Sequence, residues 1–268
     1  SVESAREKLT ALADRGVGTV LDLTTADMGR DAHYLQRVAE IAAVNIVVAT
    51  GIYWNVPMYW RGRPAEELKD VFVRDITEGI QGTEIKAGVI KLASDQQAGG
   101  VDKVNEKCLR AGARAHRETG VPIATHTGPP TLGREQQRLF KEEGVDLTRV
   151  IIGHVGDTTD TDYLKELMNR GSYIGMDRFG MDRTLGFEDR VDTVVALCRD
   201  GYSEQITLAH DASCSVDWFA DRAAVEEAMP NWHFCHITDD VVPALLERGV
   251  SEGQVETMLR ENPRRLFE

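Results

Sequence analysis

The sequence predicts an α/β fold, a (β/α)8 TIM barrel, from three observations. Short apolar runs of strand type alternate with helical patterns along all 268 residues. These runs are almost continuously apolar, as expected of parallel strands buried on both faces. The rival architecture, a doubly wound open sheet, usually carries a glycine-rich phosphate loop such as GxGxxG, and no helical pattern here opens with one. Because the connections are short and no linker interrupts them, residues 1–268 are predicted to form a single domain.

Periodicity and boundary residues predict the individual elements. Gly16 and Gly120 stand just past helical patterns, where glycine favours a helix end, and Pro64 stands at a first helical turn. Apolar runs predict strands over 18–24, 45–53, 87–94, 121–127, 149–155, 172–180 and 205–213. Helical spacing predicts helices over 3–14, 32–43, 64–80, 101–120, 131–144, 160–171, 187–201, 240–249 and 251–262. That makes seven strand–helix units, with one strand of an eight-stranded barrel unaccounted for.

Composition excludes several classes of protein. The formal net charge of −13 argues against a nucleic-acid partner. No apolar run approaches the length of a membrane span, so no membrane partner is expected. The chain has four cysteines, Cys108, Cys198, Cys214 and Cys235. They form no CxxC pair and no disulfide framework, so a cytoplasmic location is expected.

Four polar residues follow apolar runs and are the main functional signal. Lys91 follows AGVI, His126 follows VPIAT, His154 follows VIIG, and Asp211 follows ITLAH. In a parallel barrel the carboxyl ends of the strands meet on one face, where active sites are built. The sequence therefore predicts that these four side chains converge, and the combination indicates a metal hydrolase.

Two imidazoles on neighbouring strands can bind a divalent metal such as zinc, cobalt or manganese. A single histidine at a strand end is more often a hydrogen-bonded structural residue, so the pair His126 and His154 carries the argument. Asp211 can ligate a metal and also accept a proton, although it could instead cap the following helix. His210, which precedes it, should point to the opposite side of the strand, into the packing.

Lys91 needs a separate explanation, because a lysine ammonium should not be buried in an apolar strand and cannot ligate a metal. Reaction of its amine with carbon dioxide would produce a carbamate, an anion able to bridge two metals. The alternative is a salt-bridged core lysine. Lys86, five residues earlier, is expected to be an ordinary surface residue.

Several longer motifs make the sequence resemble the phosphotriesterase family of the amidohydrolase superfamily, and most of all its phosphotriesterase-like lactonases. The motifs span the chain: AGVIKLAS, VPIATHT, EEGVDLTRVIIGHVGD, SYIGMDRFGMD, HDASC and ENPRRLF. The resemblance implies two divalent metal ions (Zn, Co, Fe or Mn) bridged by an N6-carboxylysine at Lys91. It also implies that His126 and His154 hold the more exposed metal, whereas Asp211 binds the buried metal and shuttles the proton.

The same resemblance implies further roles and a substrate class. Tyr53, in GIYW, would orient the substrate carbonyl, and Arg178, in GMDRFG, would hydrogen-bond substrate or Tyr53 at the mouth of the site. Trp54 and Trp218 would line a pocket for an acyl chain, although loop packing is the simpler explanation for each. The implied substrates are lactones, such as N-acyl-homoserine lactones, with organophosphate triesters as a side activity. Family members commonly form homodimers, so a homodimer is expected.

One departure from the family pattern is serious. Members carry a His-x-His pair on their first strand, and this chain contains no HxH. The remaining histidines do not replace it, since His33 and His116 are expected on helix surfaces and His233 and His236 are spaced too widely. The segment either precedes Ser1 in a longer protein or is absent from this chain, and we expect a true absence that leaves two strand edges unpaired.

Two alternatives to a lactonase follow from these residues. A barrel without its first strand could be a metal-poor, inactive scaffold. Another amidohydrolase-type enzyme, such as a metal-dependent deoxyribonuclease, would use similar ligands. The acidic composition and the position of Lys91 argue against a deoxyribonuclease.

Overall fold

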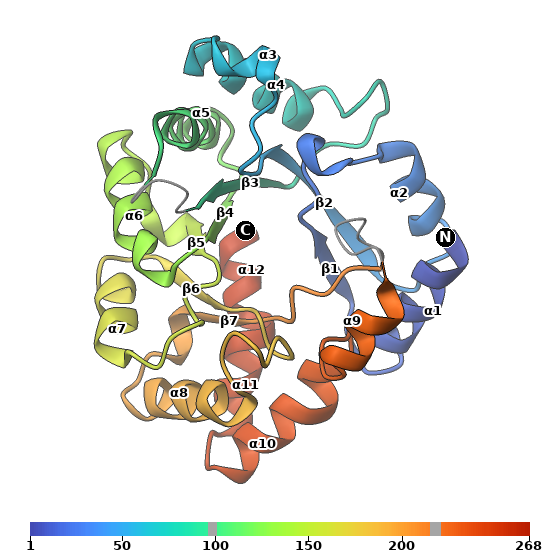
Figure 1. Ribbon diagram of the computed structural model, residues 1–268, viewed down its shortest axis with the longest axis vertical. Coiled ribbons are helices and arrows are strands. Elements are labelled where there is room, and N and C mark those ends of the chain that lie inside the picture. The colour runs from blue at the N-terminus through green and yellow to red at the C-terminus, as the bar shows by residue number, and fades with distance from the viewer. Residues whose placement is uncertain (96–100, 215–220) are drawn as a thin grey trace.

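Seven parallel strands stand side by side in chain order and curl into a partial barrel (Figure 1). The computed structural model describes residues 1–95, 101–214 and 221–268. The strands are β1 (Thr19–Asp22), β2 (Asn45–Ile52), β3 (Val89–Ser94), β4 (Ile123–Thr127), β5 (Val150–Ile152), β6 (Tyr173–Met176) and β7 (Ile206–Leu208). The α/β class, the parallel order and these seven strands agree with the sequence-based prediction, whereas the absent eighth strand stays a prediction.

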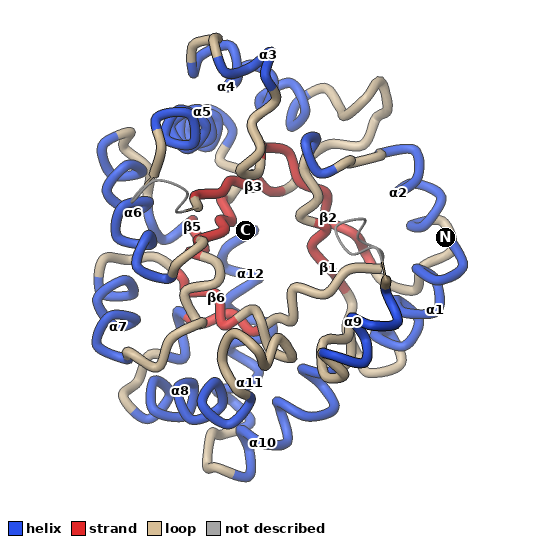
Figure 2. Tube along the Cα trace, viewed as in Figure 1, coloured by secondary structure: helices blue, strands red, loops and turns tan. Residues whose placement is uncertain are grey.

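Helices flank the ring of strands, most of them on its outside and α12 near its centre, as Figure 2 shows. They are α1 (Val2–Ala13), α2 (Ala32–Ala39), α3 (Met58–Arg61), α4 (Ala65–Thr77), α5 (Lys103–Thr119), α6 (Gly133–Glu142), α7 (Thr161–Asn169), α8 (Phe187–Arg199), α9 (Arg222–Ala228), α10 (Val242–Glu247), α11 (Glu252–Glu256) and α12 (Asn262–Phe267). Short 3-10 turns lie at Ala26–Met28, Pro130–Leu132, Leu147–Arg149 and Ser203–Gln205. Each strand therefore has an outer face that packs against the surrounding helices and an inner face that points toward the centre of the ring.

Successive side chains of each strand point alternately to the outer and the inner face. On β3, Ile90 and Leu92 belong to the large core cluster that includes the helix residues Phe72 and Leu109. The residue between them is Lys91, and Val89 belongs to a different, inner cluster with Ala49, Ala124 and the C-terminal Phe267. In Figure 1, α12 lies near the centre of the ring, where its Leu266 also packs against Ile151 and Tyr173. The inner face is thus filled by apolar side chains around α12, and Lys91 projects to this same face.

Several boundaries differ from the prediction. The last three strands end earlier than their apolar runs, and neither α3 nor α9 was predicted, because four and seven residues are too few for a clear helical period. A π-helical turn over Ile237–Val241 overlaps only the start of the predicted helix 240–249, and a second one over Thr257–Glu261 lies within the predicted helix 251–262. Pro243 and Pro263 follow these turns and lack the backbone N–H of a regular α-helix, which explains the wider turns there.

Among the residues predicted to be structural, His116 was assigned wrongly. Its side chain is buried rather than exposed, and Nδ1 lies 2.8 Å from the carbonyl oxygen of Val121. This contact ties the end of α5 to the start of the next strand. His33 and Lys86 are exposed as predicted. His210 packs against the ring of Phe234, with ring centroids 5.1 Å apart, as predicted for a side chain that turns into the packing.

The segment before α10 lies between the two ends of the sheet. No backbone pairing joins β7 to β1 in the described ranges. Phe234 and Cys235 pack with Leu9 and Leu12 of α1, and the Arg15 guanidinium pairs with Asp239 at 2.6 Å. The C-terminal part of the chain therefore contacts the N-terminal helix directly. Of the helices in the described part of the chain, none has the length and apolarity to cross a membrane.

Candidate active site

Lys91 lies inside β3 rather than at its end, which corrects the sequence-based expectation. It pairs in register with Gly51 of β2 and Ala124 of β4, and the strand continues through Ser94 because the following residues are buried. A Cβ on Gly51 would lie 1.8 Å from the carbonyl oxygen of Lys91, and Gly51 has a φ of +122°. Only glycine lets β2 pass this close to Lys91.

The amine of Lys91 is enclosed by protein. The residue is only 5% exposed, and Nζ donates a hydrogen bond to the carbonyl oxygen of Thr125 at 3.0 Å. Burial lowers the pKa of Lys91, although the charge of Asp211 opposes the shift. Within the described ranges no carboxylate forms an ion pair with this amine. The alternative of a salt-bridged core lysine is therefore not supported, and the neutral amine is favoured.

His126 presents an unused nitrogen to the interior. It lies within β4, one register position from its end, and its ring centroid is 4.7 Å from that of His154. The phenol oxygen of Tyr53 lies 2.7 Å from Nδ1, whereas Nε2 is buried and has no hydrogen-bond partner among the described residues. Burial, and then the neighbouring His154 and Lys91, lower the pKa of His126 strongly. The tautomer with its proton on Nδ1 would leave the lone pair of Nε2 available, which is the form that binds a metal through Nε2.

His154 follows β5 and is held in an unusual backbone conformation. Its φ is +63°, in the left-handed region that residues other than glycine rarely adopt. Asp177, just after β6, accepts hydrogen bonds from both the backbone N–H and, at 2.9 Å, the ring Nδ1 of His154. One carboxylate thus fixes both the backbone and the ring, and it leaves Nε2 directed away from Asp177.

Asp211 is the second residue of this group with a left-handed backbone, at a φ of +52°. It follows β7 by three residues, and its side chain is 41% exposed. Oδ2 lies 3.8 Å from Nε2 of His154 and 3.4 Å from Nε of Arg178. Such backbone strain concentrates at functional sites, so its occurrence at two of the predicted ligands is a structural sign that the sequence does not contain.

Arg178 is anchored by the buried carboxylate of Asp157. Its Nη1 donates to Asp157 at 2.8 Å, and the fully buried Arg190 donates to the other oxygen of the same carboxylate at 2.7 Å. Burial alone would lower the pKa of Arg178, but Asp157 and Asp211 outweigh it, so the pKa lies above its ordinary value. A permanent positive charge therefore lies beside Asp211.

These contacts bring the predicted ligands together, and we call Lys91, His126, His154 and Asp211 the ligand group. Two imidazoles, a carboxylate and an amine surround one region of the inner face, and the unpartnered Nε2 of His126 is the atom that a metal would satisfy. The donor set thus fits divalent cations. Trp54 contacts the group through its ring, which lies edge-on to His126 at 5.0 Å, while Trp218 lies outside the described residues.

Sequence reasoning missed two carboxylates that position the group. Asp177 holds His154, and Asp157 holds Arg178. Both occur in motifs that were recognised, GMDRFG and HVGD, and Asp177 follows β6 just as the predicted ligands follow other strands. A rule that inspected every polar residue after an apolar run would have found Asp177.

Asp177→Asn is expected to weaken metal binding about 10- to 100-fold, the range typical of lost second partners of histidine ligands. Burial alone would raise the pKa of Asp177, but His154 and Arg178 outweigh it and keep the carboxylate ionised. Competition with a chromogenic chelator measures the affinity, and Asp200→Asn, an exposed partner of Lys165, is the control. Equal metal affinities in the two variants would show that the contact of Asp177 with His154 does not contribute to metal binding.

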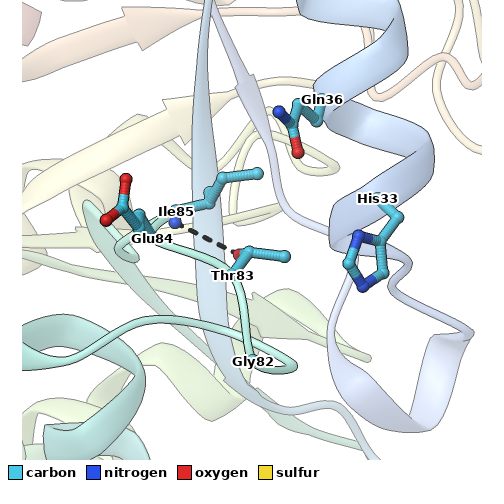
Figure 3. A pocket seen from close by; sticks show the side chains of 6 residues that line it. All are labelled: His33, Gln36, Gly82, Thr83, Glu84 and Ile85. Carbon is cyan, nitrogen blue, oxygen red and sulfur yellow. Dashed lines mark hydrogen bonds between the residues drawn. The ribbon is translucent and has the colours of Figure 1, made fainter.

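A separate surface cavity lies away from the ligand group. Figure 3 shows His33 and Gln36 of α2 facing the loop that precedes β3, with Gly82, Thr83, Glu84 and Ile85 completing the lining. None of these residues belongs to the ligand group. The cavity is therefore not part of the candidate active site.

Comparison with known proteins gives consistent matches over the whole chain. A family model described as the phosphotriesterase family matches residues 1–267. The aryldialkylphosphatase of Saccharolobus solfataricus is 41% identical over 256 residues, which cover 94% of this chain and 81% of that protein.

Solved structures match equally well. The structure of the phosphotriesterase from Mycobacterium tuberculosis has a TM-score of 0.95 and 48% identity, covering 100% of this chain and 85% of that one. A structure described as organophosphate hydrolysis activity engineered from a weak promiscuous lactonase template has a TM-score of 0.93 and 36% identity, covering 100% and 86%.

Proposed function

This chain belongs to the phosphotriesterase family, and from that premise we propose that it is a metal-dependent hydrolase that opens lactones, with phosphotriesters as side substrates. The observation that carries the proposal is the buried, unpartnered Nε2 of His126 beside His154, Asp211 and Lys91. The lactone assignment is supported by the similar structure of a hydrolase engineered from a weak promiscuous lactonase template. N-acyl-homoserine lactones are the natural candidates, because Trp54 offers apolar surface beside His126.

The ligand group would hold two divalent cations (Zn, Co, Fe or Mn), which when bound would supply Lewis-acid activation of water and of the substrate oxygen. Lys91 requires a covalent change to take part. Its neutral amine nitrogen would attack the carbon of CO2 and lose one proton to solvent, producing an N6-carboxylysine whose single negative charge is shared by two oxygens. The lowered pKa and complete enclosure of Lys91 support this reaction, since only the unprotonated amine is a nucleophile.

Three side chains of the site would then act on the substrate. Asp211 would accept a proton from water as the water oxygen attacks the lactone carbonyl carbon, and would return that proton to the alkoxide when the ring C–O bond breaks. Burial raises the pKa of Tyr53, so its phenol stays protonated and can donate to the carbonyl oxygen. Arg178, whose Nε lies 3.4 Å from Oδ2 of Asp211, would donate a hydrogen bond to the substrate.

The test compares lactones with phosphotriesters on protein loaded with metal and on chelator-treated protein. We expect lactone opening to require metal and to exceed triester hydrolysis in kcat/KM. Tyr53→Phe should lower lactone turnover about 5- to 10-fold, the effect of one lost hydrogen bond. Metal-loaded protein that hydrolyses triesters but no lactone would reject the substrate assignment and leave the family assignment standing.

Location and assembly are proposed on separate observations. All four cysteines are free thiols, which supports a cytoplasmic location. Met58 and Tyr59 of α3 are 84% and 66% exposed, and we propose that this apolar surface takes part in a homodimer. A monomeric mass from light scattering would reject the homodimer.

A further inference from the structure

A second set of metal-binding side chains lies outside the ligand group, immediately before α10. In the part of the chain that the structure describes, one group of three histidine, cysteine or acidic residues has all its ligand atoms within 4.8 Å of one another. Its members are His233, His236 and Asp240. Neither the predicted site nor the family match assigns a role to these residues.

Local structure explains why the three side chains converge. His236 begins the π-helical turn Ile237–Val241, so His233, His236 and Asp240, at i, i+3 and i+7, lie on one face of the segment. Nδ1 of His236 lies 2.8 Å from Oδ2 of Asp240, and the ring centroids of His233 and His236 are 5.6 Å apart. The spacing of the sequence and the fold agree in placing two imidazoles and one carboxylate together.

One ring nitrogen of His236 forms no hydrogen bond with the described residues. The residue is 2% exposed, and its Nε2 is buried without a hydrogen-bond partner among the described residues. Because Nδ1 faces Asp240, a cation held by His236 and Asp240 together would bind Nδ1 in place of the hydrogen bond between these two residues. His233 and Asp240 are exposed, so this group opens to solvent on one side.

We propose that His233, His236 and Asp240 form a binding site for one zinc-class divalent cation, separate from the ligand group. Two imidazole nitrogens and one carboxylate oxygen suit Zn²⁺, whereas Mg²⁺ and Ca²⁺ prefer all-oxygen sites. The open side leaves room for a water molecule as the fourth ligand.

The position of the site indicates what the cation would do. It would join the turn that contains His233 to the helical segment that contains His236 and Asp240. The adjacent residue Trp232 donates its indole N–H to the carbonyl oxygen of His210 at 2.9 Å, and Asp239 pairs with Arg15 of the N-terminal region. A cation here would therefore tie together the segment that lies between β7 and α1, and stabilise the folded chain by binding it preferentially.

The test counts zinc per chain by elemental analysis after gel filtration of the zinc-loaded full-length chain. His233→Ala and Asp240→Asn alter exposed residues and should leave folding intact, while His33→Ala is the control for loss of a surface histidine. We expect His33→Ala to retain the full zinc content, and His233→Ala to lose one zinc per chain. Asp240→Asn should lose the same zinc, and a large excess of Mg²⁺ should not displace zinc from the control.

The same comparison in a background of His126→Ala with His154→Ala separates this site from the ligand group. One zinc per chain should remain in that background and disappear when His233→Ala is added, whatever the ligand group does. Equal zinc content with and without His233→Ala, in either background, overturns the proposal. Displacement by Mg²⁺ overturns the assignment to a zinc-class cation.

Discussion

Asp211→Asn is expected to lower kcat for lactone opening by about 10²- to 10⁴-fold, the range for loss of a general acid or base. The amide cannot accept a proton from the attacking water, and it is a poorer metal ligand than a carboxylate. The fold should survive, because asparagine has the same size and tolerates the left-handed φ of +52° found at this position. An alanine at the same backbone angle would lower the free energy of unfolding by about 1 kcal/mol. A loss of activity in that variant could then come from lower stability rather than from the missing carboxylate.

The measurement is kcat at saturating metal, together with the melting temperature. Asp200→Asn is the matched control, because its side chain is 45% exposed against 41% for Asp211 and pairs with a lysine on the surface. Near-normal turnover of Asp211→Asn would eliminate Asp211 as the proton shuttle. Low turnover with a strongly lowered melting temperature would instead identify Asp211 as a structural residue.

The fold was predictable because its information is local and periodic. Each strand is a short apolar run, and each long helix has a repeating pattern with a recognisable end, as Gly120 shows with its φ of +76° after α5. The misses have physical causes as well. α3 and α9 are too short to show a period, and His116 is buried by a contact with Val121 that helical position alone does not reveal.

The candidate site was predictable only as a set of residue types. The positions of Lys91 and His126 follow from their strands, since alternation sends both to the inner face. The left-handed conformation of His154 depends on Asp177, a contact 23 residues away in sequence, which no local pattern encodes. The placement of Lys91 within β3 depends in turn on the register with Gly51 and Ala124.

Lys91→Ala is expected to abolish the bridging ligand, and with it most of the bound metal and the hydrolytic activity. The proposed N6-carboxylysine supplies two oxygens that share one negative charge, at a position where no carboxylate among the described residues pairs with the amine. Truncation to alanine leaves a space about the size of the lost side chain on the inner face. Short carboxylic acids should enter that space and partly restore metal content and turnover, because a carboxylate mimics the carbamate.

Lys91→Met provides the matched control, since methionine fills nearly the same volume without an amine. It should lose metal like Lys91→Ala, yet carboxylic acids should not rescue it, because no cavity remains. Burial disfavours the charged form of the Lys91 amine, so its removal in Lys91→Met should leave the melting temperature of the protein unchanged or raised. Mass spectrometry of the unmodified protein under native conditions should show the added mass of one CO2, absent from both variants. Unchanged metal content in Lys91→Ala would rule out the carbamate, and equal rescue of both variants would show that the acids act elsewhere.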